Sequence, residues 1–157
     1  MIRRIMKYYS IGLILIFSLL SCSRDEHDTK ILTGQEFAIR EGERMDLMDT
    51  TQFIAELEVQ EITDSRCPVN AQCIRAGEAL VTLGIRGNKG GITERELCIG
   101  DCTVIFSRTV TSDTVAISVD DISITLILLA VDPYPSLANN DTDKTASFLF
   151  ESYTITE

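Results

Sequence analysis

The chain has 157 residues, which is enough for one domain of ordinary size, and its formal net charge is −10 at pH 7. An acidic protein of this kind is not expected to bind nucleic acid, because phosphate binding needs clustered Lys and Arg side chains. The single histidine, His27, lies in a polar segment ahead of the domain, where no pocket can hold it. A Ser-His-Asp or Cys-His catalytic group is therefore excluded from the domain.

Residues 1–21 have the pattern of a secretory signal peptide. MIRRIMKYY is basic, and the apolar run SIGLILIFSLL that follows is shorter than the roughly 20 residues that a membrane-spanning helix needs. The run ends in Leu19-Leu20-Ser21-Cys22, which resembles the lipobox of bacterial lipoproteins. The resemblance implies that Cys22 is lipidated and anchors the protein to a membrane. The alternatives are a single-span N-terminal anchor and a cleaved signal with a free Cys22.

Residues 22–34 are polar and are expected to form a flexible tether. The order Ser-Arg-Asp-Glu-His-Asp after Cys22 resembles a surface-export signal of Bacteroidetes-type lipoproteins, and a plain tether is the other interpretation. Removal of residues 1–21 takes away three of the 14 basic residues and none of the 24 acidic ones, which leaves a net charge of about −13. We expect an outer membrane lipoprotein of the cell envelope that is held by its lipid and faces either the cell surface or the periplasm.

The remaining residues, 35–157, are predicted to form one all-β domain. In Phe53-Ile54-Ala55-Glu56-Leu57-Glu58-Val59, apolar residues at alternate positions from Phe53 to Val59 share one face, as in a half-buried strand. Residues 42–51 fit a helix, an irregular loop or a short strand equally well. Short strands about ten residues apart indicate a single antiparallel β-sandwich, with a small β-barrel as the alternative. The other predicted strands cover residues 79–85, 92–99, 103–110, 114–119, 122–131 and 146–154.

Four cysteines remain if Cys22 carries lipid, and an even number in an exported protein predicts disulfides. We expect the local pairs Cys67–Cys73 and Cys98–Cys102. Cross-pairing between the two groups is one alternative. A zinc site of four thiolates is another, although the spacings differ from the usual two residues.

The stretch DSRCPVNAQCIRAG carries most of the predicted site. It resembles the motif of a Bacteroidetes-type family of small exported lipoproteins that has no assigned activity. Arg75 stands where that family has Trp. The family's later Pro-Tyr-Pro segment also has a counterpart, at residues 132–135. The motif positions that match are Asp64, Ser65, Arg66, Cys67, Pro68, Cys73, Ile74, Ala76 and Gly77.

The motif predicts a rigid connection between two strands. Pro68 fixes one φ angle, and Gly77 allows a bulge or a tight entry into the next strand. Asp64 and Ser65 can cap the turn, and Arg66 can pair with Asp64 or with an acid such as Glu78. A structural staple, a loop that also contacts a partner, and an inhibitor-like loop are the three interpretations.

Two further patterns suggest functional sites but also fit an ordinary loop or turn. Asn139, Asp141 and Asp143 alternate in a loop and could hold calcium, but the Gly and Glu of an EF-hand are missing, so a polar loop is favoured and no metal is expected. Thr50 and Thr114 follow aspartates, as O-glycosylation sites of Bacteroidetes-type exported proteins do, and a simple turn explains them equally.

These features predict a membrane-anchored protein without a cofactor, whose domain is not an enzyme and binds an unknown protein or glycan partner. The alternative is a small envelope hydrolase or a protease-inhibitor-like domain that presents the Cys67–Cys73 loop. A hydrolase would need acidic residues that converge in a pocket, whereas an inhibitor would need the loop to stand clear of the domain.

Overall fold

The computed structural model describes residues 30–102, 109–138 and 143–155, and every regular element in these ranges is a β-strand. Within them, no helix has the length and apolar character that a membrane span requires. The strands, in chain order, are β1 (Lys30–Leu32), β2 (Glu36–Arg40), β3 (Arg44–Asp49), β4 (Gln52–Asp64), β5 (Glu78–Gly87), β6 (Ile92–Gly100), β7 (Asp113–Val119), β8 (Ile122–Asp132) and β9 (Thr145–Ile155).

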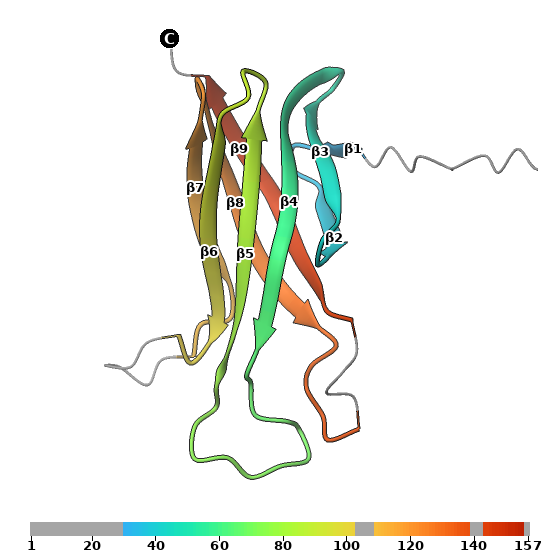
Figure 1. Cartoon of the computed structure of the whole chain (residues 1–157), viewed down its shortest axis with the longest axis vertical. Helices are drawn as coiled ribbons and strands as arrows, with labels where there is room; N and C mark the ends of the chain where they lie inside the picture. The colour runs from blue at the N-terminus through green and yellow to red at the C-terminus, as the bar shows by residue number, and fades with distance from the viewer. Residues whose placement is uncertain (1–29, 103–108, 139–142, 156–157) are drawn as a thin grey trace, which may run out of the picture.

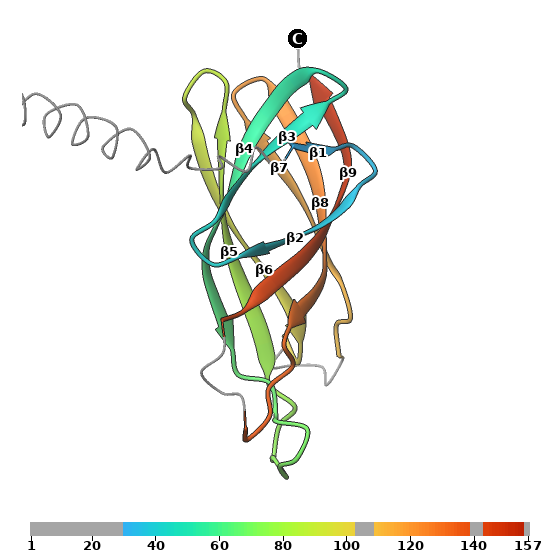
Figure 2. The same cartoon turned by 90° about the vertical axis from the view of Figure 1, so that its right-hand side faces the viewer.

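The strands form two sheets that pack face to face (Figures 1 and 2). The first has the order β1-β3-β4-β5-β6 and the second the order β2-β9-β8-β7. Every neighbouring pair is antiparallel except β1 and β3, which run parallel. The two sheets remain separate and do not close into a barrel, so the predicted β-sandwich is confirmed and the barrel alternative is wrong.

The core follows the alternation that the sequence predicts for the inner strands. In β5, residues Ala79, Val81, Leu83 and Ile85 are completely buried, and their neighbours along the strand face the other way. β8 lies between β9 and β7, as its nearly continuous apolar sequence suggests for an inner strand. Burial of these faces between the sheets is the main favourable contribution to folding.

Bulges change the predicted face of β4. Leu47 pairs with Ala55 and Met48 pairs with Phe53, which leaves Ile54 as an extra residue. Ile54 is therefore buried beside Ala55, while Phe53 is 36% exposed. The prediction that Phe53 shares the buried face is wrong. A strictly alternating pattern assumes no bulge, and the extra residue Ile54 shifts the order of buried and exposed side chains.

The N-terminal boundary also differs from the prediction. The predicted tether extended to residue 34, but Lys30–Leu32 form β1 and pair with β3. β2 was not predicted, and the ambiguous segment 42–51 contains the strand β3. Of the strand predicted at 103–110, residues 103–108 lie outside the described ranges.

The two ends of the sandwich are built differently. At one end, the turn before Ile122 is held against the β5–β6 hairpin, because Asp120 accepts a hydrogen bond of 2.8 Å from the backbone N–H of Lys89. A Cβ atom on Gly87 would lie 2.2 Å from an Asp120 carboxylate oxygen, so glycine leaves room for this contact. At the opposite end, which we call the base, β4 leads into the DSRCP motif (Figure 1).

Candidate functional site

Residues 65–77, which we call the base loop, connect β4 to β5 and project beyond the sandwich (Figure 1). The Cys67–Cys73 disulfide closes the loop, with Cα atoms 5.9 Å apart. The loop's two ends are also tied together, because Cys67 N–H donates to the Ala76 carbonyl at 2.6 Å. The predicted local pairing is confirmed, and it makes the base loop a closed ring.

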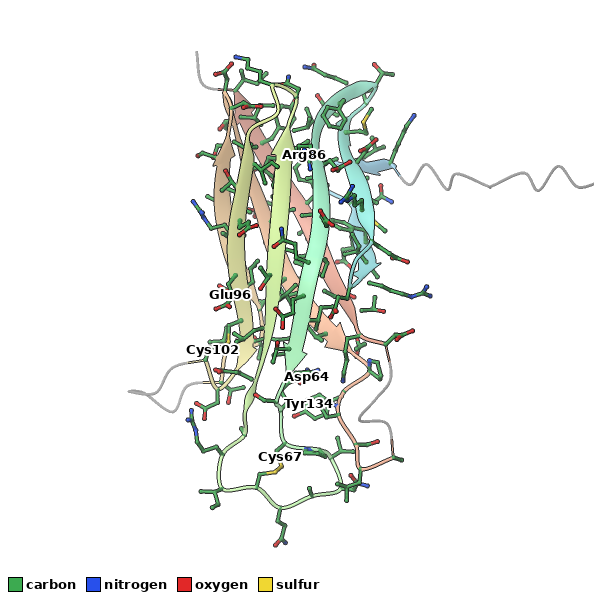
Figure 3. The ribbon with its side chains drawn as sticks, viewed as in Figure 1. Asp64, Cys67, Arg86, Glu96, Cys102 and Tyr134 are labelled. Atoms are coloured by element: carbon green, nitrogen blue, oxygen red, sulfur yellow. A yellow bond between two sulfur atoms is a disulfide. The ribbon has the colours of Figure 1, made fainter. Side chains whose placement is uncertain are left out.

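The second disulfide, Cys98–Cys102, lies at the end of β6, beside the base loop (Figure 3). This pair also matches the prediction, so cross-pairing and a four-thiolate zinc site are both wrong. Glu78, Cys98 and Cys102 offer ligand atoms within 4.8 Å of one another, but both sulfurs are used in the disulfide and supply no thiolate. The calcium prediction cannot be placed, since Asn139 and Asp141 lie outside the described ranges.

Gly77 fixes the exit from the base loop. Its φ is +72°, a conformation that side chains disfavour, and a Cβ atom there would lie 2.1 Å from the carbonyl oxygen of Ser65. Ser65 in turn pairs with Glu78 through its backbone N–H and its hydroxyl, each of which donates to the Glu78 carbonyl. The predicted tight entry into β5 is present, and only glycine fits it without strain.

Asp64 and Arg66 form a buried ion pair at the root of the base loop (Figure 3 labels Asp64). The Asp64 side chain is 2% exposed and that of Arg66 is 9% exposed. Arg66 Nε donates to Asp64 Oδ1 and Nη2 donates to Oδ2, both at 2.8 Å, and the Arg66 backbone N–H also donates to Oδ1. The predicted partner of Arg66 is therefore Asp64, in a two-point contact, rather than Glu78.

Lys144, directly before β9, completes this cluster. Its Nζ donates to Asp64 Oδ2 at 3.0 Å and to the Pro133 carbonyl at 2.7 Å. Burial by itself raises the pKa of Asp64, but the hydrogen bonds from Arg66 and Lys144 outweigh it and hold the pKa below its usual value. Asp64 is therefore charged at neutral pH and holds two cations.

Arg66 also connects the base loop to the end of β8. Its Nη2 donates to the Val131 carbonyl at 2.6 Å, and its guanidinium lies 4.3 Å from the centre of the Tyr134 ring. The segment after β8 is further bound to the loop, because Val69 N–H donates to the Pro135 carbonyl. The base loop is thus held from three directions: by its disulfide, by Asp64 and by the segment around Tyr134.

Large aliphatic side chains stand exposed on this rigid frame. Ile74 is fully exposed, and Val69 is 74% exposed. Leu137 is 64% exposed, and its backbone N–H donates to the Asn70 side chain at 2.9 Å, which connects its segment to the base loop. We call Val69, Ile74 and Leu137 the apolar tip. Exposed apolar side chains on constrained segments are a common feature of interaction surfaces.

The base also contains a hollow of about 340 Å³ on the inner side of the loop, which we call the base hollow. Among its described lining residues the one acid is Asp132, and the one cation is Arg66. A glycoside hydrolase typically needs two convergent carboxylates. The described part of the hollow does not bring two together.

The sequence missed Lys144, which lies 80 positions after Asp64. Nothing in the local pattern of a polar loop marks one lysine as buried, and only the packing of β9 against β8 brings it to Asp64. The two predicted glycosylation residues, Thr50 and Thr114, are both exposed. Cys22 and His27 lie outside the described ranges.

No family model, curated protein or solved structure matches this chain. The resemblance of its motif to small exported lipoproteins therefore stays a prediction.

Proposed function

We propose that this protein is a membrane-anchored envelope lipoprotein whose β-sandwich binds another protein through the apolar tip. The observation that carries the proposal is the full exposure of Ile74 on a loop that a disulfide and a buried ion pair hold in place. Exposed aliphatic side chains are unfavourable in water, and burial of one at an interface is worth roughly 1.5–3 kcal/mol.

Rigidity supports the same proposal. A flexible loop loses conformational freedom when it binds, and each ordered side chain reduces the affinity. In the base loop much of this conformational freedom is already lost when the protein folds, because Cys67–Cys73 closes the loop and Arg66 fixes its root. Each exposed side chain of the base loop should therefore contribute more to partner affinity than it would on a flexible loop.

The chemistry of the apolar tip favours a protein over a glycan as the partner. Sugars are bound by aromatic platforms and by arrays of polar groups, whereas Val69, Ile74 and Leu137 offer aliphatic surface alone. The acidic composition of the chain opposes nucleic acid, as phosphate contacts require basic side chains.

The hydrogen bonds and the lowered pKa of the buried Asp64 support a non-enzymatic role. Asp64 accepts hydrogen bonds from Arg66 and Lys144 on both oxygens, so its lone pairs are already used. A general base needs a free lone pair and a pKa close to the working pH. The lowered pKa of Asp64 moves it away from that range.

The position of β1 is compatible with display of the apolar tip away from a membrane. β1 lies toward the end of the sandwich opposite the base loop (Figure 1). If lipid at Cys22 anchors the chain through the residues that precede β1, the base faces outward, where a partner can reach it.

The proposal can be tested by site-specific photo-crosslinking in intact cells. A photoreactive amino acid is placed at Ile74, and the control carries it at Ile92, which is also exposed but lies at the opposite end of the sandwich. We expect one protein to crosslink at position 74 and not at position 92. The purified partner should then bind Ile74→Asp at least about tenfold more weakly than the unchanged protein, while Ile92→Asp binds normally. Equal crosslinking at both positions would contradict the proposal.

A protease-inhibitor role is the second candidate, because the base loop stands clear of the sandwich as an inhibitor loop must (Figure 1). It predicts saturable, stoichiometric inhibition of a protease by the intact protein and its loss in Ile74→Asp. Rapid cleavage of the base loop without inhibition would exclude it.

A further inference from the structure

The base hollow lies between the root of the base loop, the end of β6 and the end of β8. Its wall is largely aliphatic, and its large aliphatic members are Ile99, Val110, Leu129 and Val131. Its volume of about 340 Å³ is at the lower end of the range of small-molecule sites, roughly 300–1,000 Å³. Such a space suits a small molecule with an apolar part.

One charged group faces this apolar wall from the loop side. Arg66 lines the hollow although its side chain is only 9% exposed. Its Nε and Nη2 atoms are used by Asp64 and Val131, but Nη1 has no hydrogen-bond partner among the described residues. No buried side-chain nitrogen or oxygen in the described ranges lacks a partner, so Nη1 must remain accessible from outside the protein.

The charges around Arg66 leave a positive excess at this point. Asp64 carries one negative charge and holds both Arg66 and Lys144. The other acid near the hollow, Asp132, is exposed to water, which weakens its field at Arg66. A guanidinium held in place by a carboxylate on one side offers its remaining N–H groups to a second carboxylate.

We propose that the base hollow binds an amphipathic monocarboxylate, whose carboxylate accepts hydrogen bonds from Arg66 Nη1 and whose apolar tail packs against Leu129 and Val131. Tyr134 also lines the hollow, and its ring, whose centre lies 4.3 Å from the guanidinium carbon, keeps Arg66 oriented. This site is separate from the apolar tip and does not depend on the proposed protein partner. The same chemistry could come from a free short-chain acid or from the C-terminal residue of a peptide.

The test uses the purified full-length protein with three probes: hexanoate, hexanamide and inorganic phosphate. Binding is followed by calorimetry and by methyl NMR shifts of residues that line the hollow, with Ile92 as the distant control. We expect hexanoate to bind in a saturable way and to shift Ile99, Leu129 and Val131 but not Ile92. Hexanamide lacks the charge and phosphate lacks the tail, so each should bind at least about tenfold more weakly, the effect of losing one charge-assisted hydrogen bond or the apolar contact.

Two variants and one control test whether the ligand binds in the hollow. Thr111 is exposed and lines the hollow, whereas Thr114 is exposed on β7 and does not. Thr111→Trp should therefore block hexanoate binding, and Thr114→Trp should leave it unchanged. Arg66→Lys keeps the charge but removes Nη1, and it should weaken binding about tenfold in a variant whose far-UV spectrum shows that it is folded.

Equal binding of hexanoate and hexanamide would overturn the proposal, as would unchanged binding in Thr111→Trp. A second comparison uses N-acetyl-alanyl-leucine with a free carboxylate. Tighter binding of this peptide assigns the hollow to chain ends, and tighter binding of hexanoate assigns it to free acids. Saturable binding of neither would also overturn the proposal.

Discussion

The Arg75 guanidinium lies 3.1 Å from the Asp101 carboxylate and joins the two disulfide loops at the base of the sandwich. Asp101 is held from the other side as well, because its backbone N–H donates to the Gly77 carbonyl at 2.9 Å. Arg75 stands at the position where the predicted lipoprotein motif has Trp. At this position the chain uses an ion pair to connect the base loop to the neighbouring Cys98–Cys102 loop.

Removal of this ion pair should have a small effect on global stability. Arg75 is 59% exposed, so water screens the pair, and such contacts contribute at most about 1 kcal/mol. We expect Arg75→Ala to lower the free energy of unfolding by less than about 1 kcal/mol in urea titrations. A double-mutant cycle with Asp101→Asn should give a coupling energy of a few tenths of a kcal/mol that decreases in high salt. A coupling that salt does not change would show that the contact is not electrostatic.

Asp64→Asn should be far more damaging. The substitution leaves Arg66 and Lys144 buried without the carboxylate that balances them, and loss of one member of a buried ion pair costs roughly 3–5 kcal/mol. Chemical unfolding measures the loss. The control is Asp132→Asn, an exposed acid near the same site, which should change stability by less than about 0.5 kcal/mol. Equal effects of the two substitutions would contradict the assigned role of the cluster.

Protonation of Asp64 should make the folding stability depend on pH in the acid range. Its pKa is lower in the folded protein than the value of about 3.9 expected in the unfolded chain. The unfolded state therefore binds the proton first, and the contribution of Asp64 is complete above about pH 4 and is lost as the pH falls through the folded pKa. The stability advantage of the unchanged protein over Asp64→Asn should shrink below about pH 4. An advantage that stays constant down to about pH 2 would show that the carboxylate is not the titrating group.

Gly77→Ala and Gly90→Ala form a matched pair. Both glycines have positive φ, +72° and +89°, but a Cβ atom at Gly77 collides with the Ser65 carbonyl while Gly90 faces open space. Gly90→Ala should cost about 1 kcal/mol through backbone strain alone. Gly77→Ala should cost at least about 2 kcal/mol more, because the loop root must also move. Similar unfolding free energies for the two variants would show that the close approach at Gly77 does not occur.

The sequence predicted the features that depend on local pattern. Alternation identified the buried face of β5 from Ala79 to Ile85, and the even number of cysteines, with local pairing expected, predicted the Cys67–Cys73 closure. Both follow from physics that acts over a few residues: strand pleating and the geometry of a short disulfide loop.

The sequence could not predict features that depend on distant packing. The bulge that buries Ile54 and exposes Phe53 is set by the register against β3, and the strand β1 forms only because β3 offers it an edge. Lys144 reaches Asp64 only after β9 has packed beside β8. The base hollow likewise forms only when the root of the base loop, the end of β6 and the end of β8 come together.

The most direct test of the proposed function is photo-crosslinking at Ile74 in the presence and absence of the Cys67–Cys73 disulfide. The Cys67→Ser and Cys73→Ser double variant should lose about 2 kcal/mol of stability, since the disulfide closes only a short loop. If the apolar tip binds because it is held rigid, the crosslinking yield at position 74 should fall at least about fivefold in this variant while the domain remains folded. An unchanged yield in the double variant, or an equal yield at Ile92 in the intact protein, would contradict the proposal that the base loop is a preorganised binding surface.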